Sequence, residues 1–277
     1  MPQKVGFIGL GSMGQPFATN IAQAGFDLIV HDLRPEPVAE LVSLGARAAS
    51  SAREVAEYAE MVDIAVSGGP AVDAVMHGPD GLLAGAHPGL IALIHTSLHP
   101  VHMQSVAEEA KTHGIETLDA QMSGGWTSAV DRKLCLMVGG DPSLLERCRP
   151  VLETTATSIY TVGGVGMGAA AKIAQNLITA QYLLAASEGF RLAEKAGVDL
   201  EVFQEIVRTS SAQSWVADDY LSFWGARDRP WMYHSVLWEA LELGHSYDIS
   251  LPGAATCMQA LAHSIRKPAV DSRRVQS

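Results

Sequence analysis

Lys172 is the side chain in this sequence best suited to moving a proton. It lies early in a stretch, residues 169–196, that is rich in alanine and has the apolar pattern of a long buried helix. A charged amine on such a helix is costly unless it faces a cavity or a partner. Asn176 follows four residues later, so both side chains leave the same helix face. We predict that they act together in acid/base chemistry; the alternative is a lysine that reaches solvent from the helix end.

A second candidate is the tripeptide Ser123, Gly124 and Gly125. It offers one hydroxyl and several backbone N–H groups on a flexible turn, and such a turn can form a concave anion site. The alternative is an ordinary serine–glycine turn between two elements. If the turn binds an anion, it would hold the acidic end of a small substrate.

Three glycines near the start of the chain follow the spacing G-x-G-x-x-G. They come directly after the apolar run 4–8 and directly before an amphipathic segment. In such a unit the first glycine allows a tight turn, the second admits a pyrophosphate, and the third lets helix and strand pack closely. The helix N-terminus adds unpaired N–H groups. The spacing alone also occurs in simple turns, but in this context it predicts a nicotinamide dinucleotide held by Gly9, Leu10, Gly11, Ser12, Met13 and Gly14.

Asp32 bears on the choice of dinucleotide. It lies at the end of the second apolar run, about 20 residues beyond the glycines, where a carboxylate can accept both ribose hydroxyls of NAD. The same charge would repel the 2′-phosphate of NADP. Arg34 could instead pair with that phosphate, or be a solvated loop residue. We therefore expect NAD, with NADP as the alternative.

The fold must position these residues, and the sequence of the first half of the chain indicates which fold it is. Short apolar runs alternate there with amphipathic segments. The predicted strands are 4–8, 27–30, 61–66, 90–94, 116–118 and 134–138, and the predicted helices include 15–24, 37–44, 71–76 and 102–113. This alternation predicts a parallel sheet covered by helices on both faces, the doubly wound α/β arrangement.

The pattern changes near Val162. Four glycines punctuate residues 163–168, the long helical stretch follows, and after Gly197 the chain has helical patterns only. We predict a Rossmann-type dinucleotide-binding domain at 1–162 and an all-helical domain at 163–277, opened by the long helix. The second domain would serve substrate binding and dimerisation, with the active site between the two domains.

Composition narrows the class of protein. A chain of 277 residues suits two domains, and a net charge of −11 argues against a nucleic-acid or membrane-surface partner. The three cysteines (Cys135, Cys148 and Cys257) are too scattered for a disulfide framework or metal site, and His95, His99, His234 and His245 have no metal-ligand spacing. No secretory segment or apolar run of about 20 residues is present. We expect a cytoplasmic enzyme without a metal.

Three ordered motifs resemble the β-hydroxyacid dehydrogenase family, which includes 3-hydroxyisobutyrate dehydrogenases and tartronate semialdehyde reductases. The motifs are GFIGLGSMGQPFATNIAQAG from Gly6, LDAQMSGGWTSA from Leu118 and GGVGMGAAAKIAQN from Gly163. The resemblance runs along almost the whole chain. It implies that residues 123–125 bind a substrate carboxylate and that Lys172 and Asn176 are catalytic. It also implies a homodimer or homotetramer.

The resemblance extends to two loops that follow predicted strands. Thr96 and Ser97 occupy the place of a family Ser-Thr pair near the nicotinamide, with the order exchanged. Ser67 opens a loop, Ser-Gly-Gly-Pro, that is expected to pass by the cofactor, although the loop could be only a turn. We include Ser67 and Thr96 among the predicted cofactor contacts.

The chain departs from the family at several points. Trp126 follows the Ser-Gly-Gly turn where smaller side chains are common, and it could narrow the substrate pocket or stack on a substrate. The family's second glycine in this segment gives way to Asp131-Arg132-Lys133. Ser235 stands where the family often has a second active-site lysine. The aromatic residues around it (Trp231, Tyr233, His234 and Trp238) could accommodate a bulkier or less charged substrate, or be core or interface residues.

These observations predict an oxidoreductase that interconverts a β-hydroxy acid, or a related hydroxy compound, and its aldehyde or ketone. Lys172 would take the hydroxyl proton in oxidation and return it in reduction, and burial would lower its pKa toward the working pH. Two alternatives stay open. One is an imine reductase-like enzyme, although that related class usually has another residue at the lysine position. The other is a catalytically inactive NAD(P)-binding scaffold. No constellation of residues for a hydrolase is present.

Overall fold

The computed structural model describes residues 3–221 and 232–264, and the chain divides into two compact units, Met1–Lys172 and Ile173–Ser277. The first unit is built on one eight-stranded sheet with the order β3-β2-β1-β4-β5-β6-β7-β8. Its strands are β1 (Lys4–Ile8), β2 (Asp27–His31), β3 (Arg47–Ala48), β4 (Met61–Ile64), β5 (Ile91–Ile94), β6 (Glu116–Ser123), β7 (Leu134–Gly139) and β8 (Ala156–Gly163). This order, which starts in the middle and grows to both sides, is that of a doubly wound fold.

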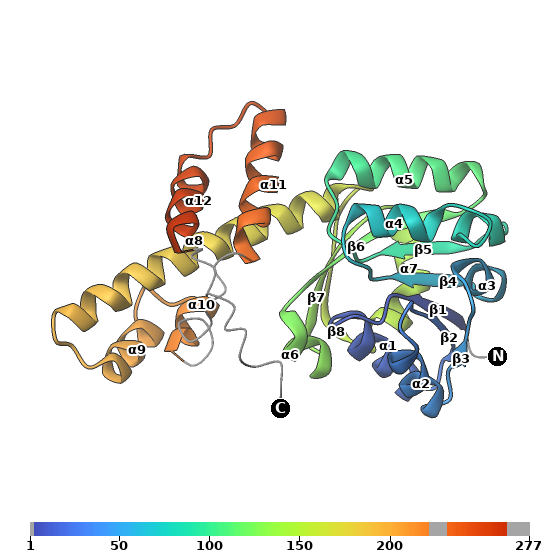
Figure 1. Cartoon of the computed structure of the whole chain (residues 1–277), viewed down its shortest axis with the longest axis horizontal. Coiled ribbons are helices and arrows are strands. Elements are labelled where there is room, and N and C mark those ends of the chain that lie inside the picture. The colour runs from blue at the N-terminus through green and yellow to red at the C-terminus, as the bar shows by residue number, and fades with distance from the viewer. Residues whose placement is uncertain (1–2, 222–231, 265–277) are drawn as a thin grey trace, which may run out of the picture. The chain divides into compact units, whose positions relative to one another are not determined.

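Helices cover both faces of this sheet (Figure 1). One face carries α1 (Gly14–Gln23), α2 (Pro35–Ser43), α6 (Gly125–Val130) and α7 (Pro142–Leu152). The other carries α3 (Ala52–Tyr58), α4 (Gly69–Met76), the short 3-10 helix η1 (Leu82–Gly85) and α5 (Pro100–Thr112). The predicted α/β fold is therefore confirmed.

Alternation along the central strands explains why both faces are apolar. In β5, Ile91 and Leu93 contribute to the core under α1 and α2, whereas Ala92 and Ile94 contribute to the core under α3 to α5. Successive side chains of a strand point to opposite faces, so a continuous apolar run supplies two cores at once.

The sheet differs from the prediction in three respects. β6 and β7 pair antiparallel, with Asp119 opposite Gly139 and Ser123 opposite Cys135, so the sheet is mixed rather than wholly parallel. A connection of ten residues joins these strands, and a short connection favours antiparallel neighbours. β3 and β8 were not predicted, and β6 extends five residues beyond the predicted end.

All regular secondary structure among the described residues of the second unit is helical, as predicted. The long helix α8 (Met167–Lys195) begins in the first unit and is followed by α9 (Leu200–Thr209), α10 (Trp215–Asp218), α11 (Met232–Ser246) and α12 (Pro252–Ser264). Two small apolar clusters hold these helices together: one contains Ala180, Leu237, Ala254 and Cys257, and the other contains Phe190, Val207 and Ala217. Within residues 3–221 and 232–264, no helix combines the length and apolar character needed to cross a membrane.

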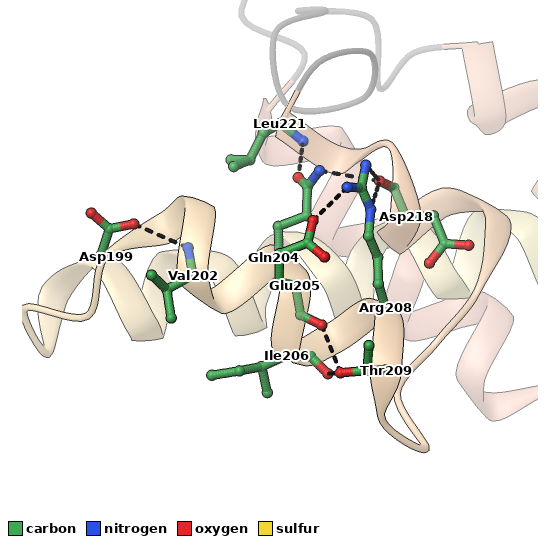
Figure 2. Close-up of polar contacts among 9 residues, drawn as sticks. All are labelled: Asp199, Val202, Gln204, Glu205, Ile206, Arg208, Thr209, Asp218 and Leu221. Atoms are coloured by element: carbon green, nitrogen blue, oxygen red, sulfur yellow. Dashed lines mark hydrogen bonds and ion pairs between the residues drawn. The ribbon is translucent and has the colours of Figure 1, made fainter.

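A polar network fixes α10 against α9 (Figure 2). The Asp218 carbonyl oxygen at the end of α10 accepts hydrogen bonds from Nε and Nη2 of Arg208, at 2.9 and 2.6 Å, and from Nε2 of Gln204 at 3.1 Å. Oε1 of Gln204 accepts a bond from the Leu221 N–H at 3.1 Å. The last carbonyl groups of a helix lack hydrogen-bond partners within the helix. Arg208 and Gln204 provide donors for the Asp218 carbonyl and so stabilise the end of this short helix.

Candidate active site

Two glycines of the loop after β1 are required by the protein's own backbone. Gly9 has a φ of 94°, and a Cβ at this position would collide with the carbonyl oxygen of Ala65. A Cβ on Gly14 would collide with the carbonyl oxygen of Gly9. Both contacts are internal, so these glycines build the turn whether or not a ligand is bound.

Gly11 is different, because a Cβ at this position would meet no atom of the described residues within 4 Å, apart from its own chain neighbours. The described protein therefore gives no internal reason for a glycine here. Open space beside backbone at the start of a helix is what a bound pyrophosphate needs. The loop fits a dinucleotide on this observation.

The N-terminus of α1 is also open to a bound anion. Its N-cap residue, Met13, makes no side-chain capping bond, and the first turn contains no acidic side chain. Ser12 is exposed, Met13 is half-buried and Leu10 is buried. The first N–H groups of α1 are thus suited to bind an anion with the positive end of the helix dipole.

Asp32 is tied to this loop. Its Oδ2 accepts a hydrogen bond from the Leu10 N–H at 2.6 Å, and its Oδ1 accepts bonds from the backbone N–H and Nε of Arg34 at 2.8 and 3.1 Å. Nη2 of Arg34 in turn donates to the Leu10 carbonyl at 2.7 Å. Burial raises the pKa of Asp32, but the bonds from Arg34 and Leu10 and the Arg34 charge outweigh it, and the net pKa lies below its usual value. Asp32 is therefore a fixed anion beside the glycine loop.

Thr96, two residues beyond the end of β5, supports a neighbouring loop. Its buried hydroxyl donates to the Val66 carbonyl at 3.0 Å and accepts a bond from the Val66 N–H at 3.1 Å. Ser67 comes next in the chain and is exposed. Thr96 thus fixes the backbone from which Ser67 projects, and the cofactor contacts of both residues stay predictions.

The Ser-Gly-Gly turn lies where β6 passes into α6. Ser123 is the last residue of β6, and Gly124 and Gly125 have φ values of 120° and 70°. Both values lie in the region that residues with a side chain rarely adopt. The turn therefore presents the half-buried serine and the first N–H groups of α6 together.

Cys135 connects this turn with Lys172, and the sequence analysis missed it. Ser123 and Cys135 are directly opposed across β6 and β7, so their side chains share one face of the sheet. Burial raises the pKa of the Cys135 thiol, and the nearby charge of Lys172 partly opposes that rise. The charge of Lys172 therefore acts on the residue that pairs with Ser123 of the Ser-Gly-Gly turn, within the first unit. The pairing register of β7 would have revealed this cysteine, but sequence alone does not give the register.

The amine of Lys172 is adapted to proton transfer. Burial lowers its pKa from the ordinary value of 10.5 to about 8, a fall that the neighbouring Cys135 opposes. Desolvation disfavours the charged form, so this amine exchanges its proton near neutral pH. Asn176 lies one turn further along α8 and is half-buried.

The remaining predicted substrate contacts, Trp126 and Ser235, stay predictions. Trp126 is 59% exposed and lines a groove of about 410 Å³ with residues of α1, including Gln15, Pro16 and Thr19. Among the described residues that line this groove, neither Ser123 nor Lys172 occurs. Ser235 is exposed on α11 in the second unit. Trp238 is 54% exposed, while Trp231 and the side chains of Tyr233 and His234 lie outside the described residues.

His95 is a buried structural residue. Its Nε2 lies 2.8 Å from Oδ1 of Asp63, and its Nδ1 lies 2.6 Å from the Ala120 carbonyl oxygen. Both side chains are fully buried in the sheet. The pair joins β4, the end of β5 and β6 below the loops just described.

Comparison with known proteins agrees with this geometry. Residues 4–164 match the family described as the NAD binding domain of 6-phosphogluconate dehydrogenase, and residues 166–272 match the NAD-binding family of NADP-dependent 3-hydroxyisobutyrate dehydrogenase. The NAD-dependent L-serine dehydrogenase of Pseudomonas aeruginosa is 36% identical over 79% of this chain and 73% of its own length. The 2-(hydroxymethyl)glutarate dehydrogenase of Eubacterium barkeri is 33% identical over 92% of this chain and 87% of its own.

A solved structure is similar over nearly its whole length. The 3-hydroxyisobutyrate dehydrogenase of Mycobacterium tuberculosis, solved with L-serine, superimposes with a TM-score of 0.84 at 27% identity, covering 95% of this chain and 94% of its own. The fold, the NAD(P)-binding loop and these matches together show that this chain belongs to the β-hydroxyacid dehydrogenase family of NAD(P)-dependent oxidoreductases.

Proposed function

We propose that this protein oxidises a β-hydroxy carboxylate to the corresponding aldehyde or ketone acid, and catalyses the reverse reduction, with Lys172 as general acid/base. One observation carries the proposal: burial lowers the pKa of the Lys172 amine to about 8, and the charge of this amine acts on Cys135, the cross-strand partner of Ser123. A group that titrates near neutral pH can both take and give a proton. The neighbouring turn is suited to hold the substrate's acidic end.

The names of the similar proteins support a substrate class. L-serine, 2-(hydroxymethyl)glutarate and 3-hydroxyisobutyrate each have a primary hydroxyl on the carbon β to a carboxylate. We propose a substrate of the same class for this chain. Its carboxylate would accept hydrogen bonds from the Ser123 hydroxyl and from the N–H groups at Gly124 and Gly125.

The cofactor is proposed to be NAD rather than NADP. The loop of residues 9–14 would hold the pyrophosphate, and the charged carboxylate of Asp32 would accept the ribose hydroxyls. Arg34 supports this choice, because its guanidinium already bonds Asp32 and the Leu10 carbonyl. Binding a 2′-phosphate would require Arg34 to give up those bonds.

Lys172 and Asn176 are proposed to have different roles in the reaction. The nicotinamide, when bound, supplies a hydride acceptor for oxidation and a hydride donor for reduction. In oxidation the neutral amine of Lys172 accepts the proton of the substrate hydroxyl, and in reduction the ammonium returns it to the oxygen. Asn176, on the same face of α8, would orient the amine or the hydroxyl.

A substrate panel with matched lysine variants tests this function. We would assay β-hydroxy acids and their aldehydes with NAD(H) and NADP(H), and compare Lys172→Ala with Lys111→Ala, an exposed lysine on α5. We expect Lys172→Ala to lose about 100- to 10,000-fold in turnover, with NAD binding retained, and Lys111→Ala to behave as wild type. Near-normal turnover of Lys172→Ala would sink the mechanism. Turnover of a cyclic imine with NADPH, but of no hydroxy acid, would favour the imine reductase alternative.

We also propose that the protein assembles as a homodimer or homotetramer. The large apolar side chains of Ile178, Tyr182 and Leu192 on α8 are 51, 51 and 72% exposed. Exposed apolar side chains along a helix are typical of subunit contacts. Light scattering on the purified protein would test this, and a monomer at micromolar concentration would contradict it.

A further inference from the structure

Asp119 is a buried carboxylate on β6 that the proposed chemistry does not use. Its side chain is fully buried, and Oδ2 accepts hydrogen bonds from the N–H groups of Gly166 at 3.1 Å and Ala169 at 2.9 Å. The N–H of Gly168 also bonds this carboxylate. A carboxylate in the middle of a strand therefore binds the first turn of α8, nearly fifty residues further along the chain.

This arrangement satisfies a specific need of α8. The first N–H groups of a helix have no partners within the helix, and a negative charge at this end is favourable. Most helices of the first unit use a residue next to the helix for this purpose, or none. In α8 the carboxylate comes from the sheet, so it fixes the helix relative to β6 as well as stabilising its end.

Glycines set the closeness of the same contact. A Cβ on Gly168 would lie 2.7 Å from the Asp119 carbonyl oxygen and 2.8 Å from that of Met137. A Cβ on Gly139 would lie 3.2 Å from Oδ2 of Asp119 and would collide with the Gly164 carbonyl oxygen. The start of α8 therefore lies directly on β6 and β7, and Asp119 determines where along the strand it lies.

A second buried residue holds Asp119 itself. Nε2 of Gln121 donates to Oδ1 of Asp119 at 3.0 Å and to the carbonyl oxygens of Thr96 and Ile94 at 3.1 and 3.3 Å. Gln121 is fully buried. The carboxylate is thus anchored to the end of β5 and has little freedom to follow the helix if the helix moves.

We propose that Asp119 is a positioning residue for Lys172, acting through the first turn of α8. Lys172 lies three residues beyond Ala169, less than one helical turn, so its Cα is carried by the peptide groups that Asp119 holds. The proposal rests on the proposed function of Lys172. It adds that the reach of the amine toward the Ser-Gly-Gly turn depends on a carboxylate that touches neither substrate nor cofactor.

The test compares Asp119→Ala and Asp119→Asn with Asp141→Ala. Asp141 is the matched control, because it caps α7 of the same unit by accepting a bond from the Ser143 N–H at 2.8 Å. Three quantities would be measured: thermal stability, kcat and KM on the best substrate of the panel, and the pH dependence of acetylation of Lys172, read by peptide mass spectrometry. The last needs no turnover and reports the surroundings of the amine directly.

We expect Asp119→Ala to lower kcat about 100-fold, because a displacement of about 1 Å can cost that much, with the KM for NAD nearly unchanged. The pKa of Lys172 should rise from about 8 toward 10.5 as the amine gains water. Asp119→Asn keeps one acceptor and should give smaller changes of the same sign. Asp141→Ala should lose stability while kcat and the Lys172 pKa stay at wild-type values.

The outcomes separate the two proposals. If Asp119→Ala folds and keeps the wild-type kcat and Lys172 pKa, Asp119 does not position the lysine. If Asp119→Ala does not fold, Asp119→Asn decides: a several-fold fall in kcat or a raised Lys172 pKa supports the proposal, and wild-type values for both overturn it. If Lys172→Ala keeps its turnover, the proposed function fails, and the acetylation profile alone still shows whether Asp119 sets the surroundings of Lys172.

Discussion

The backbone N–H of Leu10 donates a hydrogen bond of 2.6 Å to Oδ2 of Asp32, so the end of β2 holds the glycine loop that follows β1. The carboxylate proposed to bind the ribose therefore also shapes the site for the pyrophosphate. Replacing Asp32 should affect both parts of the cofactor, while replacing Arg34 should affect mainly the choice between NAD and NADP.

Asp32→Ser should shift the cofactor preference toward NADP. Removing the carboxylate removes its repulsion of a 2′-phosphate and releases Arg34 to pair with that phosphate. We expect the KM for NAD to rise about tenfold and the KM for NADP to fall, as measured by steady-state kinetics with both cofactors. Glu108→Gln, which removes an exposed charge from α5, is the control and should change neither KM. An unaltered preference in Asp32→Ser would contradict the proposed role of Asp32.

The two glycines Gly11 and Gly14 should respond differently to alanine. Gly14→Ala should destabilise the protein, because the new methyl group would collide with the Gly9 carbonyl oxygen. Gly11→Ala should leave the thermal midpoint unchanged but weaken NAD binding, because its methyl group would fill space that is open in the protein. Calorimetry of unfolding and of NAD binding distinguishes the two. Unweakened NAD binding by Gly11→Ala would place the pyrophosphate elsewhere.

The pH dependence should be opposite in the two directions of the reaction. Oxidation needs the neutral amine of Lys172, so its rate should rise as the pH passes about 8. Reduction needs the ammonium, so its rate should fall above the same pH. Profiles of kcat/KM against pH in both directions would measure this. The control, Lys111→Ala, should keep both the rise in oxidation and the fall in reduction near pH 8. Flat profiles through pH 8 in both directions would exclude Lys172 as the acid/base group.

Lys172→Met should stabilise the fold while abolishing turnover. Methionine has a similar length and no charge to desolvate, so the free energy of unfolding at pH 7 should rise by about 0.5–2 kcal/mol. Because the folded-state pKa is lowered, the cost of burying the charge is greatest below about pH 8, and wild-type stability should improve as the pH rises from there. Urea unfolding at pH 7 and pH 9 would test both statements. Equal stability of the two proteins at pH 7 would mean that the amine is not desolvated.

Sequence reasoning located the strands whose apolar runs feed both cores, such as β4 and β5. It failed where polar residues are buried. The apolar pattern predicts a strand at 116–118 only, and the strand continues through the polar residues Asp119 and Gln121. Both are fully buried and hydrogen-bonded within a strand that continues to Ser123. Those partners lie on β5 and α8, far away in the sequence, and no local pattern could reveal them.

Two other differences have the same kind of cause. β8 was missed because it is an edge strand, with polar and exposed residues that lack an apolar run. Arg132 lies in the segment where the family has a glycine, and it adopts a φ of 59°. Its side chain donates hydrogen bonds to Gln23 at 2.6 Å and Asn20 at 3.3 Å, and these bonds offset the backbone strain. The sequence shows that the family's glycine is absent from this segment, but it does not show that Arg132 adopts a positive φ and is held by Gln23 and Asn20.

The reversal of direction between β6 and β7 has a consequence for where the chain travels. β8 runs with β7, opposite to β1–β6, and its last residue, Gly163, lies level with Gly139, Asp119 and Ile94, the last residue of β5. The chain therefore enters α8 at the level where β5 ends, beside the part of β6 that continues from Asp119 to Ser123. One reversed pair of strands thus brings a residue from far along the chain to the end of the sheet where the loops of the first half already meet.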